Sequence, residues 1–296
     1  GHVLESIINQ TYSNVEVIVV NNGSVDNTAK IIEEYKPKFL AKGYMLKHIE
    51  VPRPLGHAPA INEGLKRASG KYILILHSDV ALGSSDWIET MVNELKHNSK
   101  VAVTSSLLIT KPEELSFINR VFAYIYILGW HDYVKLPKMY VNYTGLNNDL
   151  IRAEVFNEVG LLDETYKYGT HDIVFSEMVR RRGYLILLNP EVYAKHLLSY
   201  DQTTLRGHIR KLWQYGFPSP IVLMRFRYLP NIDNLLFALS FILSITYIFL
   251  KDFLTLLLIA ILMLLASIPL EPPNYYGSNK YARKILKMLA NAVTAT

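Results

Sequence analysis

The sequence predicts an α/β domain with a mostly parallel central sheet, followed by an α-helical membrane hairpin. Over about the first two hundred residues, short apolar runs alternate with segments of helical periodicity, which is typical of βαβ units. After residue 231, two runs without a charged residue, 235–250 and 253–270, approach the length needed to cross a hydrocarbon core of roughly 30 Å. Two core helices of a globular domain are the alternative, but neither run has a polar face.

The first half of the domain is predicted from turn and capping residues. A helix over 3–10 precedes a strand over 15–20, which the segment Asn-Asn-Gly-Ser at 21–24 breaks. Ser24 or Asp26 is placed to cap the next helix, which runs to about residue 35. We then expect a strand over 45–51, a helix around 61–68, a strand over 72–76, a helix over 87–97 and a strand over 101–108.

The second half is less regular. Segment 117–130 is apolar and aromatic, and burial, membrane contact or lining of an acceptor channel would each account for it. The rhythm then returns, and we expect a helix from Arg152, a helix over 173–182 ended by Gly183, a strand over 184–188 and a closing segment over 192–196.

The strand over 72–76 is the one around which the domain is organised. It is apolar, as suits a buried strand of a parallel sheet, and it ends abruptly in His77-Ser78-Asp79. Ligands of open α/β sheets lie outside the carboxyl ends of the strands. Asp79 therefore lies where a carboxylate could hold a divalent cation against a phosphate, although an Asp in a simple turn is the plainer reading.

Composition narrows the possible partners. Half of the 296 residues are hydrophobic, and the formal net charge is +5. Lys and Arg form no long block, so we expect contact with an anionic membrane or a phosphorylated ligand, and no nucleic acid. The chain has no cysteine, which excludes disulfides and Cys-ligated metals.

Six segments, in order and at matching spacing, resemble the family 2 glycosyltransferases with a Rossmann-like A-type fold. The closest likeness is to the branch that includes rhamnosyl- and galactofuranosyltransferases. The segments are Leu4–Tyr12, Val19–Thr28, the glycine-containing stretch 55–64, Leu76–Val80, the acceptor-side block 159–164 with His171-Asp172, and Arg181–Tyr184.

The resemblance implies an enzyme that moves one sugar, with inversion, from a nucleotide-sugar donor to an acceptor. Asp172 is implied as the catalytic base, although a carboxylate at a helix start could also be an N-cap. Asp79 and His196 are implied as ligands of Mn²⁺ or Mg²⁺. The implied nucleotide-sugar contacts are Asn21, Ser24, Asp26, Gly56, Asn62 and Ser78.

The sequence departs from the family in three places. Asn21 stands where an Asp usually contacts the base, and His77 and His171 replace the usual Asn or Asp and the usual Glu of their motifs. The family's first strand is missing, so we expect it to precede Gly1. A catalytically inactive, membrane-tethered sugar-nucleotide-binding relative is the alternative function.

Four regions are expected: a catalytic domain over 1–215, a juxtamembrane linker over 216–232, the membrane hairpin over 233–270 and a basic amphipathic tail over 271–296. Lys and Arg flank both outer ends of the hairpin, which places the catalytic domain on the cytoplasmic side of the cell membrane. A domain held this close to a bilayer favours a lipid-linked or glycan acceptor.

Overall fold

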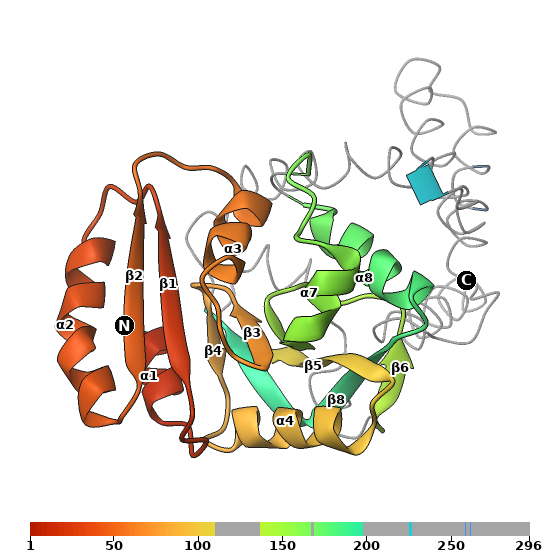
Figure 1. Ribbon diagram of the computed structural model, residues 1–296, viewed down its shortest axis with the longest axis horizontal. Coiled ribbons are helices and arrows are strands. Elements are labelled where there is room, and N and C mark those ends of the chain that lie inside the picture. Colours follow the sequence, from red (N-terminus) through yellow and green to blue (C-terminus); the bar gives the residue numbers. More distant parts are fainter. Residues whose placement is uncertain (110–136, 167–168, 198–224, 227–257, 259–260, 262–296) are drawn as a thin grey trace, which may run out of the picture. The chain divides into compact units, whose positions relative to one another are not determined.

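The computed structural model describes residues 1–109, 137–166, 169–197, 225–226, 258 and 261. The chain divides into two compact units, residues 1–120 with 130–219 and residues 121–129 with 220–296. Every helix and strand named below lies in the first unit (Figure 1).

A small parallel sheet holds the amino-terminal part of this unit. It pairs β1 (Glu16–Asn22) with β2 (Met45–Val51), and Asn21 lies opposite Glu50 in the register. Helices α1 (His2–Ile8) and α2 (Thr28–Ala41) accompany these strands, and the buried Phe39 and Tyr44 fill the space between them. Burial of these aromatic rings stabilises this part of the unit, at about 25 cal/mol per Å² of apolar surface removed from water.

The large sheet has six strands. Its path is β3-β7-β5-β8-β4, and β6 pairs with β8 off this path. The strands are β3 (Tyr72–Leu76), β4 (Val80–Leu82), β5 (Val101–Ile109), β6 (Met139–Val141), β7 (Asn148–Arg152) and β8 (Leu185–His196).

The expectation of a mostly parallel sheet is wrong for these strands. Only β5 and β8 pair in parallel, while β7 runs antiparallel to both β3 and β5, and β4 and β6 run antiparallel to β8. Sequence reasoning missed β7 because it begins with polar residues and passes directly into helix α7 (Ala153–Val159). It missed β4 because a three-residue strand is too short to show periodicity.

Helices cover both faces of the large sheet (Figure 1). On one face, α3 (His57–Leu65), α7 and α8 (His171–Arg181) pack on inward residues such as Ile151 and Ile186. On the other, α4 (Trp87–His97) packs on their strand neighbours Leu150 and Leu187. Successive residues of a strand point to opposite faces of the sheet, so neighbouring residues pack under different helices.

Three element boundaries differ from expectation in ways that affect the site. Helix α3 begins at His57 instead of near 61, since Pro59 is acceptable in a first turn. Helix α8 begins at His171, so Asp172 lies inside its first turn and is not its N-cap. The predicted strand over 184–188 and the closing segment over 192–196 belong to one strand, β8.

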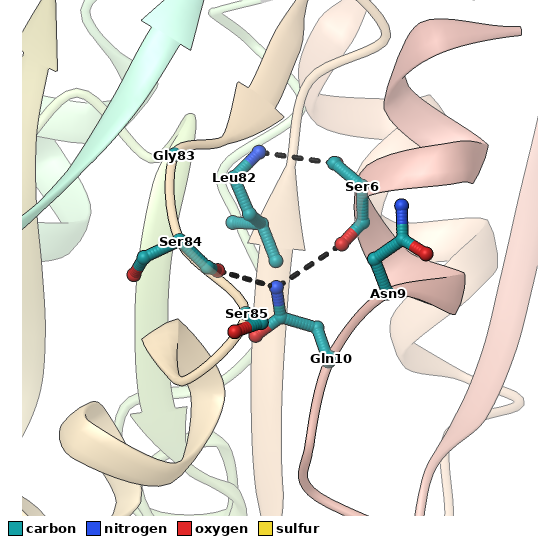
Figure 2. Close-up of a pocket in the computed structure, with 7 residues that line it drawn as sticks. All are labelled: Ser6, Asn9, Gln10, Leu82, Gly83, Ser84 and Ser85. Atoms are coloured by element: carbon teal, nitrogen blue, oxygen red, sulfur yellow. Dashed lines mark hydrogen bonds between the residues drawn. The ribbon is translucent and has the colours of Figure 1, made fainter.

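A pocket of about 170 Å³ lies between α1 and the chain that follows β4 (Figure 2). Gln10 holds it together, because its side-chain amide donates to the carbonyls of Ser6 and Ser84 and accepts from Ile88 N–H. The lining residues are Ser6, Asn9, Gln10, Leu82, Gly83, Ser84 and Ser85. Because Asp79 precedes β4 and Gly83 follows it, this pocket lies at the other end of the strand from the predicted site.

Several predictions concern residues outside the described part of the chain, namely the aromatic segment 117–130, the hairpin over 233–270 apart from residues 258 and 261, and the basic tail. Within the described residues, no helix is both long enough and apolar enough for a membrane span. In that same part, β1 pairs only with β2, and β3 pairs only with β7. The position of a further strand before Gly1 stays a prediction.

Candidate active site

The predicted site residues gather at one end of the strands. Glu16, the first residue of β1, accepts hydrogen bonds from the backbone N–H and the hydroxyl of Ser69, just before β3. Strands β1 and β3 therefore start at the same end, and their carboxyl ends also coincide. Asn22, which ends β1, donates to the carbonyl of Gly56 (3.2 Å), the residue immediately before α3. Helix α3 thus begins beside the end of β1.

Asp79 and His196 are brought together by the pairing of β4 with β8. Val80 lies opposite His196 in the antiparallel register, and the Leu197 N–H donates to the Asp79 carbonyl. The Nε2 atom of His196 lies 3.3 Å from Oδ2 of Asp79, and both side chains are partly exposed. The sequence predicted this pair, although the two residues lie far apart along the chain.

His77 contributes a neutral ring beside this pair. Burial, together with the nearby His57, lowers its pKa to about 4, while Asp79 opposes the shift. Its backbone is fixed, since the His77 N–H donates to Asn147 and its carbonyl accepts from Val80. Ser78, between His77 and Asp79, is exposed. At neutral pH the ring can donate or accept a hydrogen bond but carries no charge.

Asp172 lies in the first turn of α8, after Thr170, whose backbone is left-handed at φ 68°. Burial raises the pKa of the Asp172 carboxyl to about 6, although its hydrogen bond from the Ile173 N–H (2.9 Å) and the charge of His57 oppose the shift. A carboxylate of this pKa is ionised at neutral pH and is a better proton acceptor than an exposed Asp.

His171 is 4 % exposed, and burial lowers its pKa. The carbonyls of Tyr166 and Gly169 lie near and favour the charged form, but neither ring nitrogen has a hydrogen-bond partner in the described structure. A buried imidazole in this state has unused donor and acceptor capacity beside Asp172.

His57 is a site residue that sequence reasoning missed. As the first residue of α3, it places its ring edge-on to His77, with centroids 5.6 Å apart, and edge-on to His171 at 6.3 Å. It therefore connects the Asp79 side of the site with the Asp172 side. The only sequence signal was a His directly after a glycine at a helix start.

The predicted nucleotide-binding turn follows β1. Gly23 has φ 72°, and a Cβ there would lie 2.6 Å from backbone atoms of Arg53 and Pro54, so the turn and the loop before α3 pack without space for a side chain. Ser24 and Asp26 are exposed at this turn. The Asp26 carboxylate accepts from the Thr28 N–H and hydroxyl and so stabilises the start of α2.

Asn62 lies apart from the other predicted contacts. It is buried, its amide donates to the Leu162 carbonyl and to the Glu164 carboxylate, and its Oδ1 accepts from the Leu162 N–H. All these bonds tie α3 to the loop before α8. In the described structure Asn62 therefore positions that loop, and a direct donor contact from it stays a prediction.

The described residues supply only some of the ligands that a divalent cation needs. Asp79 offers a hard oxygen and His196 an imidazole nitrogen, a pair that suits Mn²⁺ or Mg²⁺. Among the described residues, no third His, Asp or Glu completes a metal cluster with them. The two side chains therefore fit a cation whose remaining ligands come from a bound phosphate and water, as is usual for Mg²⁺ at phosphate sites.

These features define an α/β protein of the A-type glycosyltransferase class. Residues 1–158 match the family described as Glycosyl transferase family 2, and the chain belongs to that family. The particular branch predicted from the sequence is not tested by these matches.

Two relatives illustrate the similarity. An uncharacterized glycosyltransferase of Haemophilus influenzae is 32 % identical over 208 residues, which cover 68 % of this chain and 62 % of that protein. The poly-β-1,6-N-acetyl-D-glucosamine synthase of Staphylococcus epidermidis is 33 % identical over 127 residues, covering 43 % of this chain and 29 % of that protein. The chain thus spans less than two thirds of the length of either.

Solved structures share the fold at low identity. The mannosyltransferase PcManGT from Pyrobaculum calidifontis, in complex with GDP-Man and Mn²⁺, matches with a TM-score of 0.52 and 16 % identity over 88 % of this chain and 82 % of its own. GalNAc-T7 with UDP, GalNAc and Mn²⁺ matches with a TM-score of 0.52 and 15 % identity over 71 % of this chain and 44 % of its own.

Proposed function

We propose that this chain transfers one sugar from a nucleotide-sugar donor to an acceptor hydroxyl, with inversion at the anomeric carbon and with the help of a divalent cation. The observation that carries the proposal is that Asp172, a partly buried carboxylate of raised pKa, and the Asp79–His196 pair are linked through His57 at one end of the strands. Family membership supports it.

Asp172 acts as the general base. It accepts the proton of the acceptor hydroxyl, whose oxygen forms a bond to the anomeric carbon. The bond from that carbon to the diphosphate breaks, and its electron pair leaves with the diphosphate. One displacement of this kind inverts the anomeric centre. His171, whose ring nitrogens have no hydrogen-bond partner among the described residues, is placed to hydrogen-bond a sugar hydroxyl beside Asp172.

Asp79 and His196 would hold Mn²⁺ or Mg²⁺, which as a Lewis acid neutralises charge on the departing diphosphate. Mn²⁺ in the two similarly folded structures supports this assignment. The donor would extend from there towards the turn after β1, so that Gly56 and Ser78 lie along its phosphates and Ser24 and Asp26 lie at the nucleoside, with Asn21 buried behind them.

We also propose that the chain is anchored in the cell membrane by the hairpin over 233–270, with the catalytic domain on the cytoplasmic side and a lipid-linked or glycan acceptor. The support is the charge-free runs and the basic residues that flank them, Arg225 and Arg227 before and Arg283, Lys284 and Lys287 after. The signature Gln-x-x-Arg-Trp of the processive synthases is absent near Trp213, which favours transfer of a single sugar.

A catalytically inactive donor-binding protein is the second candidate. The observation that favours it is the replacement of two motif residues by His77 and His171, since the pKa of each imidazole is lowered and both rings favour the neutral form. Such a protein would bind nucleotide without releasing it from the sugar. Donor hydrolysis or transfer therefore separates the two functions.

The test is an assay of the full chain against UDP-, GDP- and dTDP-sugars, with Mn²⁺ or with a chelator. We expect metal-dependent donor cleavage that Asp79→Ala abolishes and Asp86→Ala leaves unchanged, because Asp86 is an exposed carboxylate beyond the other end of β4. Equal donor affinity with and without chelator would overturn the role of Asp79.

The membrane proposal has a separate test, deletion of residues 231–296. We expect loss of transfer to a polyprenyl-phosphate-linked acceptor while donor hydrolysis continues. Equal activity of both forms on a soluble sugar acceptor would contradict the proposal.

A further inference from the structure

One exposed carboxylate at this end of the strands has no role in the function proposed above. Glu50 lies opposite Asn21 in the β1–β2 register, one residue before the end of β2. Its side chain is 55 % exposed, yet its position is fixed, because the Asn21 amide donates to both carboxylate oxygens at 3.0 Å. Nε2 of His48 also lies 3.1 Å from Oε2.

Asn21 itself is poorly placed to contact a ligand. It is 2 % exposed, its amide nitrogen is directed to Glu50, and its Oδ1 accepts from the Ser24 N–H at 3.2 Å. A buried amide with both groups in use positions its neighbours instead of reading a partner. The group that reaches solvent from this pair is the Glu50 carboxylate.

The position of Glu50 follows from a series of contacts along the carboxyl ends of the strands. Next to Asn21 in β1, Asn22 donates to the carbonyl of Gly56 and accepts from the Leu55 N–H. Gly56 is followed by His57, whose ring contacts His77, two residues before Asp79. The Asp79–His196 pair and Glu50 thus lie at opposite ends of one row. A donor with its diphosphate at Asp79 extends along this row and brings its base to Glu50.

We propose that Glu50 selects the donor by its nucleobase, accepting the ring N–H of guanine, uracil or thymine. The inference rests on the proposed function, because it takes the ligand to be a nucleotide sugar. Guanine presents N1–H and N2–H as a fork that matches two carboxylate oxygens, while uracil and thymine present N3–H. Adenine and cytosine have a lone pair at the corresponding ring nitrogen, which a carboxylate repels.

The experiment removes the Glu50 carboxylate from the protein and the ring N–H from the nucleotide independently. Binding of UDP, GDP, ADP and CDP to the full chain is measured by calorimetry with Mn²⁺, together with N3-methyl-UDP and N1-methyl-GDP, which lack the ring N–H. The proteins are wild type, Glu50→Gln and Glu33→Gln. Glu33 is the matched control, because it is 52 % exposed and contacts the other nitrogen of His48 from α2.

For wild type we expect the preferred nucleotide to bind about 5- to 150-fold more tightly than its N-methyl analogue, the usual discrimination from a good contact to a base. Glu50→Gln should reduce that ratio to about twofold or less, as a neutral amide is a weaker acceptor. Glu33→Gln should leave it unchanged, and both variants should melt as wild type does.

The two levels of the proposal fail in different ways. Metal-dependent nucleotide binding with the same methylation ratio in wild type and Glu50→Gln would overturn the role of Glu50 and leave the proposed function intact. The absence of a methylation effect in wild type, or a preference for ADP or CDP, would also overturn it. No binding of any nucleotide to wild type would overturn the proposed function and this inference together.

Discussion

The two ends of the candidate site are held in place by different forces. Where β1 and β2 end, hydrogen bonds between polar side chains and backbone fix Asn21, Asn22 and Glu50, and the resulting surface is open to solvent. Around the end of β3 and the start of α8, burial fixes the residues instead. There His77 and Asp172 have shifted pKa values, and the ring nitrogens of His171 have no hydrogen-bond partner in the described part of the chain.

This difference suits two tasks. Recognition of a ligand needs groups in a set geometry, which paired hydrogen bonds supply at low cost. Proton transfer needs a group whose pKa lies near the working pH, which burial supplies. Substitutions on the first side should therefore change affinity and stability, and substitutions on the second should change turnover and pH dependence.

The largest expected effect is that of Asp172→Asn. The amide keeps the shape and the Ile173 N–H contact but cannot accept a proton, so kcat should fall by about 10²–10⁴. Donor affinity, measured by calorimetry, should change by less than about threefold. Asp86→Asn, another acid at a helix start, is the control and should retain full kcat. Loss of donor binding with an unchanged kcat would mean that Asp172 binds the ligand and does not transfer the proton.

The pH profile of wild type sharpens this prediction. Because the Asp172 carboxyl must be ionised to accept a proton and its pKa is raised to about 6, kcat should rise with pH through about 6 and then level off. An acid limb near 4, the value of an exposed Asp, would show that burial does not tune this group.

Asp149 tests whether burial raises the pKa of a carboxyl group that has no proposed role in catalysis. It is fully buried in β7, and burial raises its pKa to about 6 against hydrogen bonds from Ser105, Thr144 and the Asn147 N–H. The unfolded value is near 3.8, so the favourable contribution is present below pH 3.8 and is lost as pH rises through 6.

Between pH 4 and 7 the stability of wild type should therefore fall relative to Asp149→Asn, by about 3 kcal/mol for a shift of this size. Urea unfolding of both proteins across that range measures the difference. A constant difference at all pH values would place the Asp149 pKa at its unfolded value.

Gly23, in the turn after β1 on the recognition side, and Gly43, just before the start of β2, form a matched pair. Both have positive φ, 72° and 81°, so an alanine strains either backbone by about 1 kcal/mol. At Gly23 a Cβ would also meet Arg53 and Pro54 backbone at 2.6 Å, whereas at Gly43 nothing lies within 4 Å. Gly23→Ala should cost about 1–3 kcal/mol more than Gly43→Ala and should weaken donor binding, with thermal melting and calorimetry as measurements. If both substitutions lowered the free energy of unfolding equally, the turn after β1 would have room to adjust to a side chain at position 23.

The smallest expected effect is that of Glu16→Gln, at the opposite end of β1 from the site. Burial opposes ionisation of Glu16, but hydrogen bonds from Lys47 and Ser69 outweigh it and lower its pKa to about 2. Its contribution is therefore present above pH 4.5 and lost as pH falls towards 2. Because Lys47 is 40 % exposed, solvent screens the pair, and we expect about 1 kcal/mol at pH 7 by urea unfolding. No change in stability at pH 7 would show that Ser69 is held by other contacts.

Much of this arrangement could be predicted from the sequence, and the exceptions have a common cause. Asp79 follows an apolar run and His196 ends another, so both could be placed at strand ends from the printed residues alone. His57 and Glu50 gain their positions only through contacts with residues distant in sequence, His171 and Asn21, which no local pattern reveals. Strand β7 was missed for the same reason, since its partners and not its composition make it a strand.

The pairing of β4 with β8 also sets an order of events during synthesis. Val80 leaves the ribosome long before its partner His196, and at 5–20 residues per second the interval is on the order of ten seconds. Until then β4 presents an unpaired edge of apolar residues, and Asp79 has no histidine beside it. A nascent chain paused in this interval would be prone to aggregation, and the Asp79–His196 pair would be among the last features of the domain to form.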